Sequence, residues 1–556
     1  MEQREATHAS AQAMAAAGAL VARGELAAAE QRLLAHLREW REDTRALHGL
    51  AAILIETGRP DIAAQVMERL ITLSPGEPGH HLTLAALLRQ LGRSAELVPL
   101  YRRMCAALPG HALAHFNLGC ALRSARQDED ALAAHRRALA LGIDQPEECW
   151  SNIAAILADL HRHADAREAL EQALAANPRW VPARYNLGLW LEEHGERAAA
   201  LAEFRRVLEI EPAWHDARVR IAWLQRCGGP EDPLLGELRD ALAQPALAPL
   251  TRENLQFALG KSLEDCGQYA AAFDAFAQGN LESRARVAAY DRGDTEMVFR
   301  RIREGMSRDW LRGVKPVSER RLVFICGMFR SGSTLLEQML AAHPAVTAGG
   351  EIDWFPRQLL RAERGVFPER VSADAGFRTA LGAGYMALLA QRFPGAELVT
   401  DKRPDNFLCI GLLAGLFPNA RFLHTVRDPR DTCLSIWCQQ LEDGLGYAAD
   451  LADTAHYFGL YRELLRHWQA LLPGRILDVE YAQLVAEPEP VLRGACSFLG
   501  LPWHEDMLAF HSVDNRVRTA SLWQVREPLY TASVGRWRRY ADQSEALRGI
   551  EDAYGS

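Results

Sequence analysis

Several patterns that identify common protein classes are missing from this sequence. The ten cysteines among 556 residues form no C-x-x-C pair and no metal-ligand spacing with histidine, which predicts reduced core thiols and no metal site. No run of about 18 uninterrupted apolar residues occurs, and the first residues, "MEQREATHAS", contain no apolar signal segment. The net charge of −9 argues against the basic stripe of a nucleic-acid-binding protein. We therefore expect a cytoplasmic protein that neither spans a membrane nor binds nucleic acid.

The chain length suggests about three to four domains, and the N-terminal part is repetitive. Glycines and prolines recur 34 residues apart: Gly24, Gly58 and Gly92, Pro75 and Pro109, and Pro178 and Pro212. Alanines between them allow antiparallel helices to approach closely, and larger side chains fill the seam between units. The pattern resembles the tetratricopeptide helix–turn–helix repeat. We expect an all-α solenoid of roughly six units over residues 1–228, followed by a divergent unit and a helical connector over residues 229–313.

The residue pattern changes in the last part of the chain. Short runs of β-branched and aromatic residues end in polar residues or glycine, and helical segments separate them. These predicted strands cover residues 321–327, 396–402, 420–428 and 474–481. Strands that alternate with helices indicate an α/β doubly wound parallel sheet, which we assign to residues 314–556. Its active site should lie at the carboxyl ends of the strands.

A phosphate-binding loop without its lysine follows the first predicted strand. In "GMFRSGST" Gly327, Gly332 and Thr334 match the template G-x-x-x-x-G-K-[ST], but Ser333 occupies the lysine position. The loop N–H groups, the hydroxyls and Arg330 would still bind an anion. A terminal sulfate has fewer negative oxygens than a terminal phosphate, so a phosphosulfate suits a P-loop-like turn that lacks both lysine and metal. The alternative is a purely structural turn between strand and helix.

A second candidate anion element is "VRDPRDTCLS". Arg427 ends a predicted strand, and Ser435 follows eight residues later in the next helix. We expect Asp428 and Asp431 to cap that helix and fix its turn. Two anion elements on neighbouring strand ends imply a nucleotide with two phosphorylated positions. The alternative is a surface network of arginine and aspartate.

Together, "FRSGSTLLEQML" and "VRDPRDTCLS" resemble the sulfotransferase family, which uses 3′-phosphoadenosine 5′-phosphosulfate (PAPS). The resemblance covers roughly residues 320–545. It is to the bacterial proteins that join tetratricopeptide repeats to a sulfotransferase domain and, more distantly, to the tyrosylprotein sulfotransferases. It implies that the 5′ end of PAPS is held by Arg330, Ser331, Gly332, Ser333 and Thr334. By the same resemblance, Arg427 and Ser435 hold the 3′-phosphate.

The resemblance also suggests the catalytic groups. Glu351 matches the catalytic base of the tyrosylprotein branch, and Lys402, helped by Arg330, would stabilise the departing phosphate. His343 is the rival base, although its place at a helix end favours capping or packing. Near the C-terminus, Ser521 matches a serine close to the sulfate. Further expected contacts are Arg526 to a phosphate, Tyr481 to the adenosine, and Trp537 as a packing residue.

We therefore expect a metal-independent PAPS-dependent sulfotransferase that acts on a hydroxyl or amine of a peptide, glycan or small molecule. Asp353 stands where tyrosylprotein sulfotransferases carry an arginine that receives acidic acceptor peptides, which argues against that acceptor class. The repeat groove would recruit the acceptor or a protein partner, with a packing surface as the alternative. Another alternative is an interaction scaffold whose C-terminal domain only binds a nucleotide. A P-loop kinase or hydrolase is disfavoured by the missing lysine.

Overall fold

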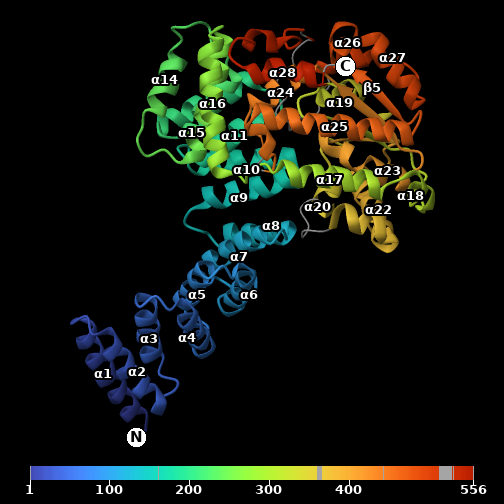
Figure 1. The fold of residues 1–556 in the computed structure, drawn as a ribbon. Coiled ribbons are helices and arrows are strands. Elements are labelled where there is room, and N and C mark those ends of the chain that lie inside the picture. Colours follow the sequence, from blue (N-terminus) through green and yellow to red (C-terminus); the bar gives the residue numbers. More distant parts are fainter. Residues whose placement is uncertain are drawn as a thin grey trace. The chain divides into compact units, whose positions relative to one another are not determined.

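The computed structural model describes residues 2–160, 162–359, 366–441, 444–512, 529 and 531–554. The chain forms two compact units, Met1–Leu187 and Gly188–Ser556. Figure 1 shows helices throughout the first unit and both helices and strands in the second. These bounds differ from the domain edges expected at residues 228 and 313. Helices that precede residue 314 share a core with the strand-bearing part, as described below.

The first unit consists of helical hairpins. Their helices are α1 (Glu2–Val21), α2 (Leu26–Glu39), α3 (Thr44–Glu56), α4 (Pro60–Leu73), α5 (Pro78–Gln90), α6 (Leu97–Ala107), α7 (Ala112–Ser124), α8 (Asp128–Ala140), α9 (Pro146–Asp159) and α10 (His163–Ala176). Each odd-numbered helix packs on the even-numbered one that follows it. Small residues make this possible, because Ala29, Ala63 and Ala131 are fully buried between helices. The predicted tetratricopeptide solenoid is therefore confirmed as a helical repeat.

The periodic glycines and prolines have distinct structural roles. Gly24, Gly58 and Gly92 adopt positive φ angles of 70° to 76° at the turn inside each hairpin, where glycine is least strained. Each periodic proline presents its carbonyl to a side chain six residues further on. The pairs are Pro75 with His81 (3.0 Å), Pro109 with His115 (3.3 Å), Pro178 with Arg184 (2.8 Å) and Pro212 with Arg218 (3.1 Å). These bonds join the end of one unit to the first helix of the next.

The second unit begins with more helices of this kind. After α11 (Val181–Glu193), which crosses the boundary between the units, it contains α12 (Arg197–Ile210), α13 (His215–Leu224), α14 (Pro233–Leu242), α15 (Pro249–Asp265), α16 (Tyr269–Arg286), α17 (Arg292–Gly305) and α18 (Arg308–Gly313). A Cβ added to Gly188 would lie 2.6 Å from the ring of Phe204, and one on Gly260 would lie 2.6 Å from Phe276. Each glycine thus faces a phenylalanine sixteen residues later. The equivalent packing identifies α15 and α16 as the divergent repeat.

The strand-bearing part contains five parallel strands in the order β2-β3-β1-β4-β5. They are β1 (Val323–Gly327), β2 (Val346–Ala348), β3 (Leu398–Lys402), β4 (Arg421–Val426) and β5 (Ile476–Glu480). The four predicted strands are confirmed, whereas β2 was not predicted. The helices of the strand-bearing part are α19 (Ser333–Ala341), α20 (Trp354–Leu359), α21 (Val371–Ala373), α22 (Ala375–Arg392), α23 (Ile410–Leu416), α24 (Pro429–Trp437), α25 (Leu451–Leu471), α26 (Tyr481–Ala486), α27 (Pro488–Leu499) and α28 (Glu545–Tyr554). Short 3₁₀ or π segments cover residues 94–96, 366–370, 404–409, 446–449, 505–512 and 536–540.

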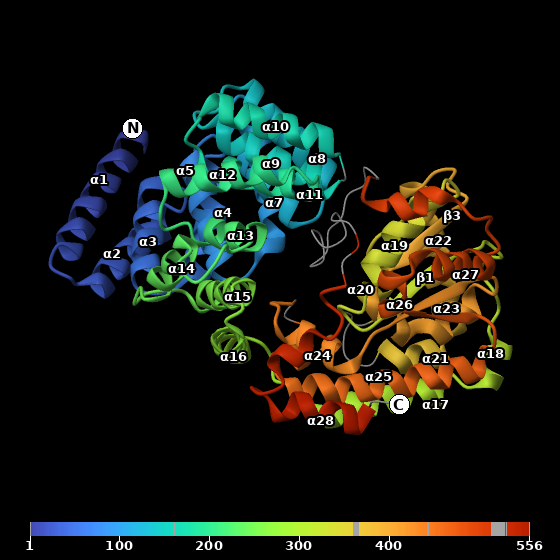
Figure 2. The same cartoon turned by 90° about the horizontal axis from the view of Figure 1, so that it is seen from above.

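Helices cover both faces of the sheet (Figure 2). On one face, Val323 and Ile325 of β1 belong to a core that α19, α26 and α27 complete. On the other face, Phe324 lies 6.1 Å from the ring of Tyr385 in α22 and 6.5 Å from Phe417, just after α23. Successive side chains of a strand point to opposite faces, which accounts for the nearly continuous apolar sequence of β1. The predicted doubly wound fold is confirmed.

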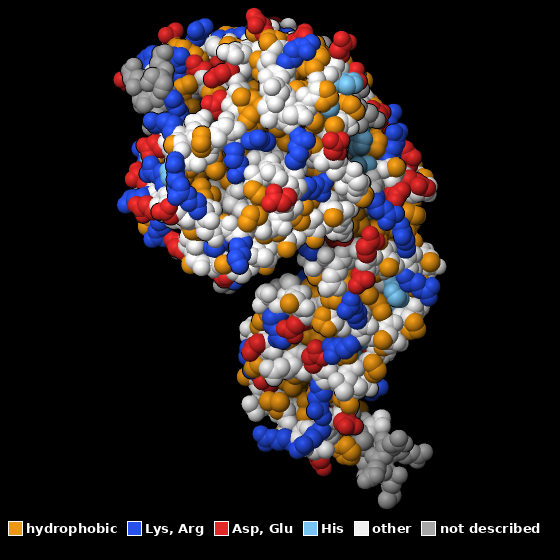
Figure 3. All heavy atoms as spheres, turned by 90° about the vertical axis from the view of Figure 1, so that its right-hand side faces the viewer, with side chains coloured by type: hydrophobic (Ala, Val, Ile, Leu, Met, Phe, Trp, Pro, Cys, Tyr) orange, Lys and Arg blue, Asp and Glu red, His pale blue; other side chains and the backbone are white. Residues whose placement is uncertain are grey.

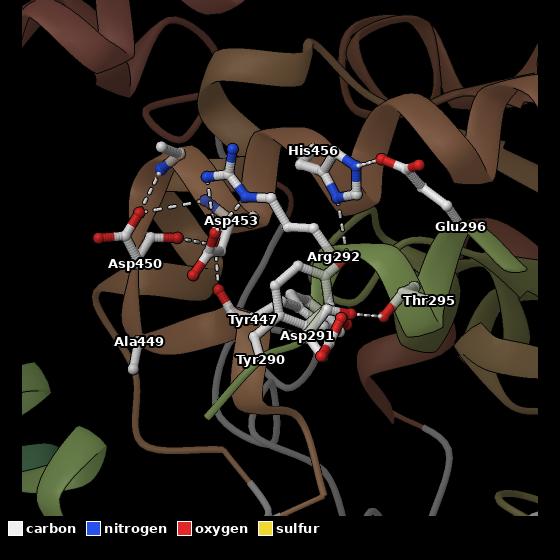
Figure 4. A network of polar contacts seen from close by, with 12 residues as sticks. Tyr290, Asp291, Arg292, Thr295, Glu296, Tyr447, Ala449, Asp450, Asp453 and His456 are labelled. Atoms are coloured by element: carbon white, nitrogen blue, oxygen red, sulfur yellow. Dashed lines mark hydrogen bonds and ion pairs between the residues drawn. The ribbon is translucent and has the colours of Figure 1, made fainter. Parts of the chain in front are cut away.

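The divergent repeat packs directly against the sheet-bearing part. Asn280 of α16 donates a 2.9 Å hydrogen bond to the carbonyl of Trp437, and the rings of Phe273 and Trp437 lie 4.5 Å apart. Figure 4 shows the adjoining connector, in which Arg292 donates to Asp453 (2.7 Å). His456 of α25 lies between the Tyr290 hydroxyl (3.0 Å) and Glu296 (2.9 Å). The helices from α15 to α17 therefore belong structurally to the second unit.

The surface is mixed in character. On the face shown in Figure 3, basic and acidic side chains are interspersed, and hydrophobic ones are scattered among them. Among the residues that the structure describes, no helix combines the length and hydrophobicity needed to cross a bilayer.

Candidate active site

The loop between β1 and α19 has an unusual backbone held from inside. Gly332, the N-cap of α19, has a φ of 102°, and Arg330 adopts a φ of 67°, which non-glycine residues rarely do. The hydroxyl of Ser331, only 2% exposed, lies 2.6 Å from both the Met328 carbonyl and Thr425 Oγ1. Ser331 thus stabilises the loop shape from within. Ser333 and Thr334 begin α19 and are also buried.

The two predicted anion elements are brought together. β1 and β4 are neighbours in the sheet, so the loop after β1 lies beside the end of β4. Arg330 Nε donates a hydrogen bond to Ser435 Oγ over 3.2 Å, and Arg427 Nη1 donates to the carbonyl of Arg330 over 2.8 Å. Arg330, Arg427 and Ser435 therefore form one cluster at the carboxyl edge of the sheet, as a nucleotide-binding edge requires.

Tyr481 closes one side of this cluster. A Cβ on Gly332 would lie 2.5 Å from Tyr481 Cδ2, so the ring packs directly on the loop. The guanidinium carbon of Arg427 lies 4.9 Å from the ring centroid, within the range of a cation–π contact. The Tyr481 hydroxyl lies 2.7 Å from Ser533 Oγ, and Arg427 Nη2 donates to the Ser533 carbonyl over 2.7 Å. Ser533 was not recognised from the sequence.

The two aspartates of "RDPRD" have different roles. Asp428 caps α24, because its side chain accepts hydrogen bonds from the backbone N–H groups of Arg430 and Asp431. The prediction that Asp431 also caps this helix is wrong. Its buried carboxylate, pointing away from the helix end, accepts from the N–H groups of Gly535 (2.6 Å) and Trp537 (2.9 Å). Trp537 packs under Arg430, whose guanidinium carbon lies 3.8 Å from the ring centroid.

Glu351 and Lys402 form an ion pair at the same edge of the sheet. Lys402 Nζ, at the end of β3, lies 2.5 Å from Glu351 Oε1. The lysine side chain is 1% exposed, whereas the glutamate side chain is 34% exposed. A buried lysine therefore faces a carboxylate that reaches solvent.

The Gly349–Gly350 turn sets the position of Glu351. The N–H of Gly349 donates to the Thr400 carbonyl, and the Lys402 N–H donates to the Gly350 carbonyl, both over 2.9 Å. A Cβ on Gly349 would collide with the Thr400 carbonyl, so only glycine allows this close approach. The turn continues the pairing of β2 with β3 beyond the strand end, which places Glu351 beside Lys402.

Glu337 of α19 is a buried carboxylate that sequence reasoning missed. Its Oε1 accepts hydrogen bonds from the Gly350 N–H (3.0 Å) and from Thr400 Oγ1 (2.8 Å). Burial raises the pKa of Glu337, while the nearby charge of Lys402 and these two hydrogen bonds oppose the shift. Lys402 is thus close to two carboxylates, one buried and one exposed.

The residues around Lys402 form a compact polar group. Buried Asp401 accepts from the Tyr385 hydroxyl over 2.7 Å and from Asn406 Nδ2 over 3.1 Å. Burial raises the pKa of Asp401 to about 7, against the effect of these hydrogen bonds. Arg403 binds Asp405 through two hydrogen bonds of 3.0 and 3.1 Å and lies 3.6 Å from Asp353. The positive charge of Arg403 is therefore balanced by two aspartates.

The remaining predicted residues lie elsewhere. His343 is 3% exposed, with Nε2 3.0 Å from the Pro502 carbonyl and Nδ1 accepting from the Ala345 N–H over 3.1 Å. Both ring nitrogens are thus engaged in local structure at the end of α19. Ser521 and Arg526 lie outside the described residues. No group of three or more His, Cys, Asp or Glu suited to a metal ion occurs in the part of the chain that the structure describes.

This arrangement has the chemistry of an anion site beside an acid–base pair. Arg330, Arg427 and Lys402 supply cations, the first turn of α19 and the loop supply N–H groups, and Glu351 supplies an exposed carboxylate. Such donors fit a ligand with two separated anionic groups better than a neutral one.

Comparisons with known proteins agree with both parts of the chain. Residues 323–505 match the model described as "Sulfotransferase family", and residues 161–245 match the model described as "Tetratricopeptide repeat". An uncharacterized protein of Aquifex aeolicus (strain VF5) is 28% identical over 400 residues, covering 69% of this chain and 52% of that protein. The protein-tyrosine sulfotransferase of Drosophila melanogaster is 27% identical over 278 residues, covering 45% of this chain and 53% of that protein.

Further similarities cover smaller shares of this chain. Protein-tyrosine sulfotransferase A of Caenorhabditis elegans is 29% identical over 248 residues, 41% of this chain and 61% of that protein. The chain thus spans about half to three fifths of the length of these relatives. Among solved structures, the sulfotransferase domain from the Synechococcus PCC 7002 olefin synthase is 23% identical over 44% of this chain and 98% of that one, with a TM-score of 0.34. MamA is 21% identical over 29% of this chain and 95% of that one, with a TM-score of 0.27.

The matched residues 323–505 contain β1, the phosphate loop, Glu351, Lys402, Arg427 and Ser435. The match to the repeat model ends in the loop between α14 and α15. Residues 323–505 are therefore similar to the sulfotransferase family, and residues 161–245 are similar to tetratricopeptide repeats.

Proposed function

We propose that this chain transfers a sulfuryl group from PAPS to a hydroxyl or amine acceptor without a metal ion. The observation that carries the proposal is the convergence of Arg330, Arg427 and Ser435 beside the Lys402–Glu351 pair at one edge of the sheet. The exposed carboxylate of this pair offers an acceptor a proton-accepting group, which nucleotide binding alone does not require.

The binding residues divide between the two ends of the nucleotide. Arg330, Gly332, Ser333 and Thr334 would hold the 5′ end through the loop and the first turn of α19, with Ser331 shaping the loop from inside. Arg427 and Ser435 would hold the 3′-phosphate, and Tyr481 would border the adenosine beside Gly332. When bound, PAPS supplies the sulfuryl group. Ser521 and Arg526 remain predicted contacts of the sulfate and a phosphate.

Glu351 and Lys402 would have different roles in the chemistry. Glu351, whose carboxylate reaches solvent, removes the proton from the acceptor hydroxyl. Lys402 and Arg330 stabilise the negative charge that develops on the phosphate side, and burial of Lys402 strengthens this interaction. His343 is a weaker choice for the base because both of its ring nitrogens have partners.

The solvent-exposed charged side chains beside the proposed acceptor position are acidic. Glu351 and Asp353 side chains are about one third exposed, whereas Lys402 and Arg403 are almost enclosed. A carboxylate next to the acceptor hydroxyl would be repelled there. Neutral or basic peptides, glycans and small hydroxylated molecules fit better than acidic tyrosine peptides. We further propose that the repeats recruit the acceptor or a protein partner, and that the protein acts in the cytoplasm.

The test is calorimetric titration with 3′-phosphoadenosine 5′-phosphate (PAP), with and without chelator. Wild type should bind, Arg427→Ala should lose binding, and Arg312→Ala should bind as wild type because Arg312 is 73% exposed. A folded wild type that binds no PAP would overturn the proposal and leave the scaffold function. Binding that disappears with chelator would refute metal independence and favour a P-loop kinase or hydrolase.

A further inference from the structure

The segment Thr531–Tyr540 lies against the proposed 3′-phosphate site. Its Ser533 carbonyl accepts from Arg427 Nη2 over 2.7 Å, and its Ser533 hydroxyl lies 2.7 Å from that of Tyr481. Two residues further on, the Gly535 N–H donates to Asp431 of α24 over 2.6 Å. The segment thus contacts Arg427 and Tyr481, two side chains that border the proposed nucleotide site.

The other end of the segment is held by the divergent repeat. Arg536 Nε donates to Glu264 Oε1 of α15 over 2.6 Å, and Arg536 Nη2 donates to the second carboxylate oxygen. Both side chains are largely buried, at 18% and 16% exposed. Fully buried Tyr540 continues this contact, with its ring 5.6 Å from that of Tyr269 in α16. The paired, two-bond geometry is the strong and directional form of an arginine–carboxylate contact.

We propose that Glu264, on a repeat helix, is a positioning residue for the 3′-phosphate site. Through Arg536 it fixes the segment so that Ser533 holds Arg427 and Tyr481 in place. This inference rests on the proposed function, because it assigns the 3′-phosphate to Arg427. Its new content is that the repeat hairpin α15–α16 helps to build the cofactor site.

The physical reason is the cost of an uncompensated buried charge. Without the Glu264 carboxylate, the guanidinium of Arg536 stays buried among Tyr540 and Cys438, with no counter-charge at that position. Moving the segment towards solvent relieves this cost. Since Ser533 lies three residues before Arg536, such a movement also withdraws the partner of Arg427 Nη2 and of the Tyr481 hydroxyl.

A purely structural ion pair would behave differently, and two nucleotides distinguish the cases. PAP carries the 3′-phosphate, whereas adenosine 5′-phosphosulfate lacks it. We expect Glu264→Gln in the full chain to weaken PAP binding about 10-fold. Binding of adenosine 5′-phosphosulfate should weaken less, because of the two side chains that Ser533 holds only Tyr481 borders a group that this nucleotide contains. Glu282→Gln on α16 is the matched control, because its carboxylate makes only a 3.6 Å surface contact with Arg252.

A second variant guards against simple misfolding. Glu264→Gln combined with Arg536→Gln removes both charges, so PAP affinity should recover in part. Equal loss of both nucleotides, or unchanged PAP affinity in Glu264→Gln, would overturn the inference. An unfolded single variant together with a double variant that does not recover PAP affinity would also overturn it.

Hydrogen exchange separates this inference from the proposed function. Without any ligand, amides of residues 531–540 should exchange faster in Glu264→Gln than in wild type or Glu282→Gln. Unchanged exchange would refute the positioning role itself. A folded wild type that binds neither nucleotide would instead refute the proposed function and the 3′-phosphate role, whatever the exchange shows.

Discussion

Lys402 Nζ lies 2.5 Å from Glu351 Oε1 and joins the end of β3 to the turn that follows β2. The pair combines a cation with almost no exposure and a carboxylate that is one third exposed. The carboxylate thus provides a counter-charge to a buried lysine and still reaches solvent. Under the proposed function, the two residues have different roles in one reaction.

Glu351→Gln should separate chemistry from binding. The amide keeps the size of the side chain but cannot take a proton, so the rate of PAP formation from PAPS should fall by about 100-fold or more. PAP affinity should stay close to that of wild type. The rate is measured with a panel of phenol, alcohol and amine acceptors, and Glu397→Gln, an exposed position just before β3, is the control. Normal turnover in Glu351→Gln, with activity lost in His343→Gln, would make His343 the base.

Glu337 variants should show that this buried carboxylate holds the turn before Glu351. Glu337→Ala leaves the Gly350 N–H without its 3.0 Å partner, which costs about 1–3 kcal/mol of stability. The melting temperature should fall, and amide exchange at Gly350 should accelerate. Glu337→Gln keeps an acceptor oxygen and should therefore lose less stability than Glu337→Ala. Glu489→Ala, on the exposed side of α27, is the control. Slow exchange at Gly350 in Glu337→Ala would contradict the role.

Gly332→Ala should damage the phosphate loop directly. At a φ of 102°, a side chain is strained by about 1–2 kcal/mol, and the new Cβ would lie 2.5 Å from Tyr481 Cδ2. We expect PAP affinity to drop about 10-fold or more, measured by calorimetry. Gly494→Ala is the matched control, since nothing lies within 4 Å of a Cβ placed there on α27. Equal behaviour of the two variants would mean that the loop does not contact the ligand.

Asp401→Asn should change how stability depends on pH. The folded-state pKa of Asp401 is about 7, above its ordinary value of 3.8. Its contribution to stability is therefore greatest below the ordinary value and is lost as the pH rises through about 7. The melting temperature of wild type relative to that of the variant should therefore be higher at about pH 5 than at about pH 8. A gap that widens with pH would contradict this, and Asp240→Asn on exposed α14 controls for charge removal.

Local patterns in the sequence were sufficient for the repeats and for four strands. The periodic glycines and prolines mark turns and unit ends, which are set by residues close in the chain. β2 was not predicted because it has only three residues, too few to show a strand pattern. The role of Glu337 has no local signal, because its partners Gly350 and Thr400 are distant in sequence.

Site contacts that bridge distant segments could not be predicted. Motif similarity indicated Arg330, Arg427 and Ser435 separately, but their hydrogen bonds depend on β1 and β4 being neighbours. The roles of Ser533 and Glu264 have no local signal, because the contact of Glu264 with Arg536 joins residues 272 positions apart. The misassignment of Asp431 has the same origin: its partners belong to a segment about a hundred residues later.

The packing of α15–α17 on the sheet-bearing part has a consequence for how such a chain can evolve. Repeat arrays change length by gaining or losing whole units. Units gained or lost in the first compact unit leave the contacts of Phe273 and Asn280 with Trp437, and of Arg292 with Asp453, untouched. A deletion that reaches α16 removes them and exposes a tryptophan. The number of repeats in the first unit can therefore change, whereas the last hairpin must be inherited together with the sheet-bearing part.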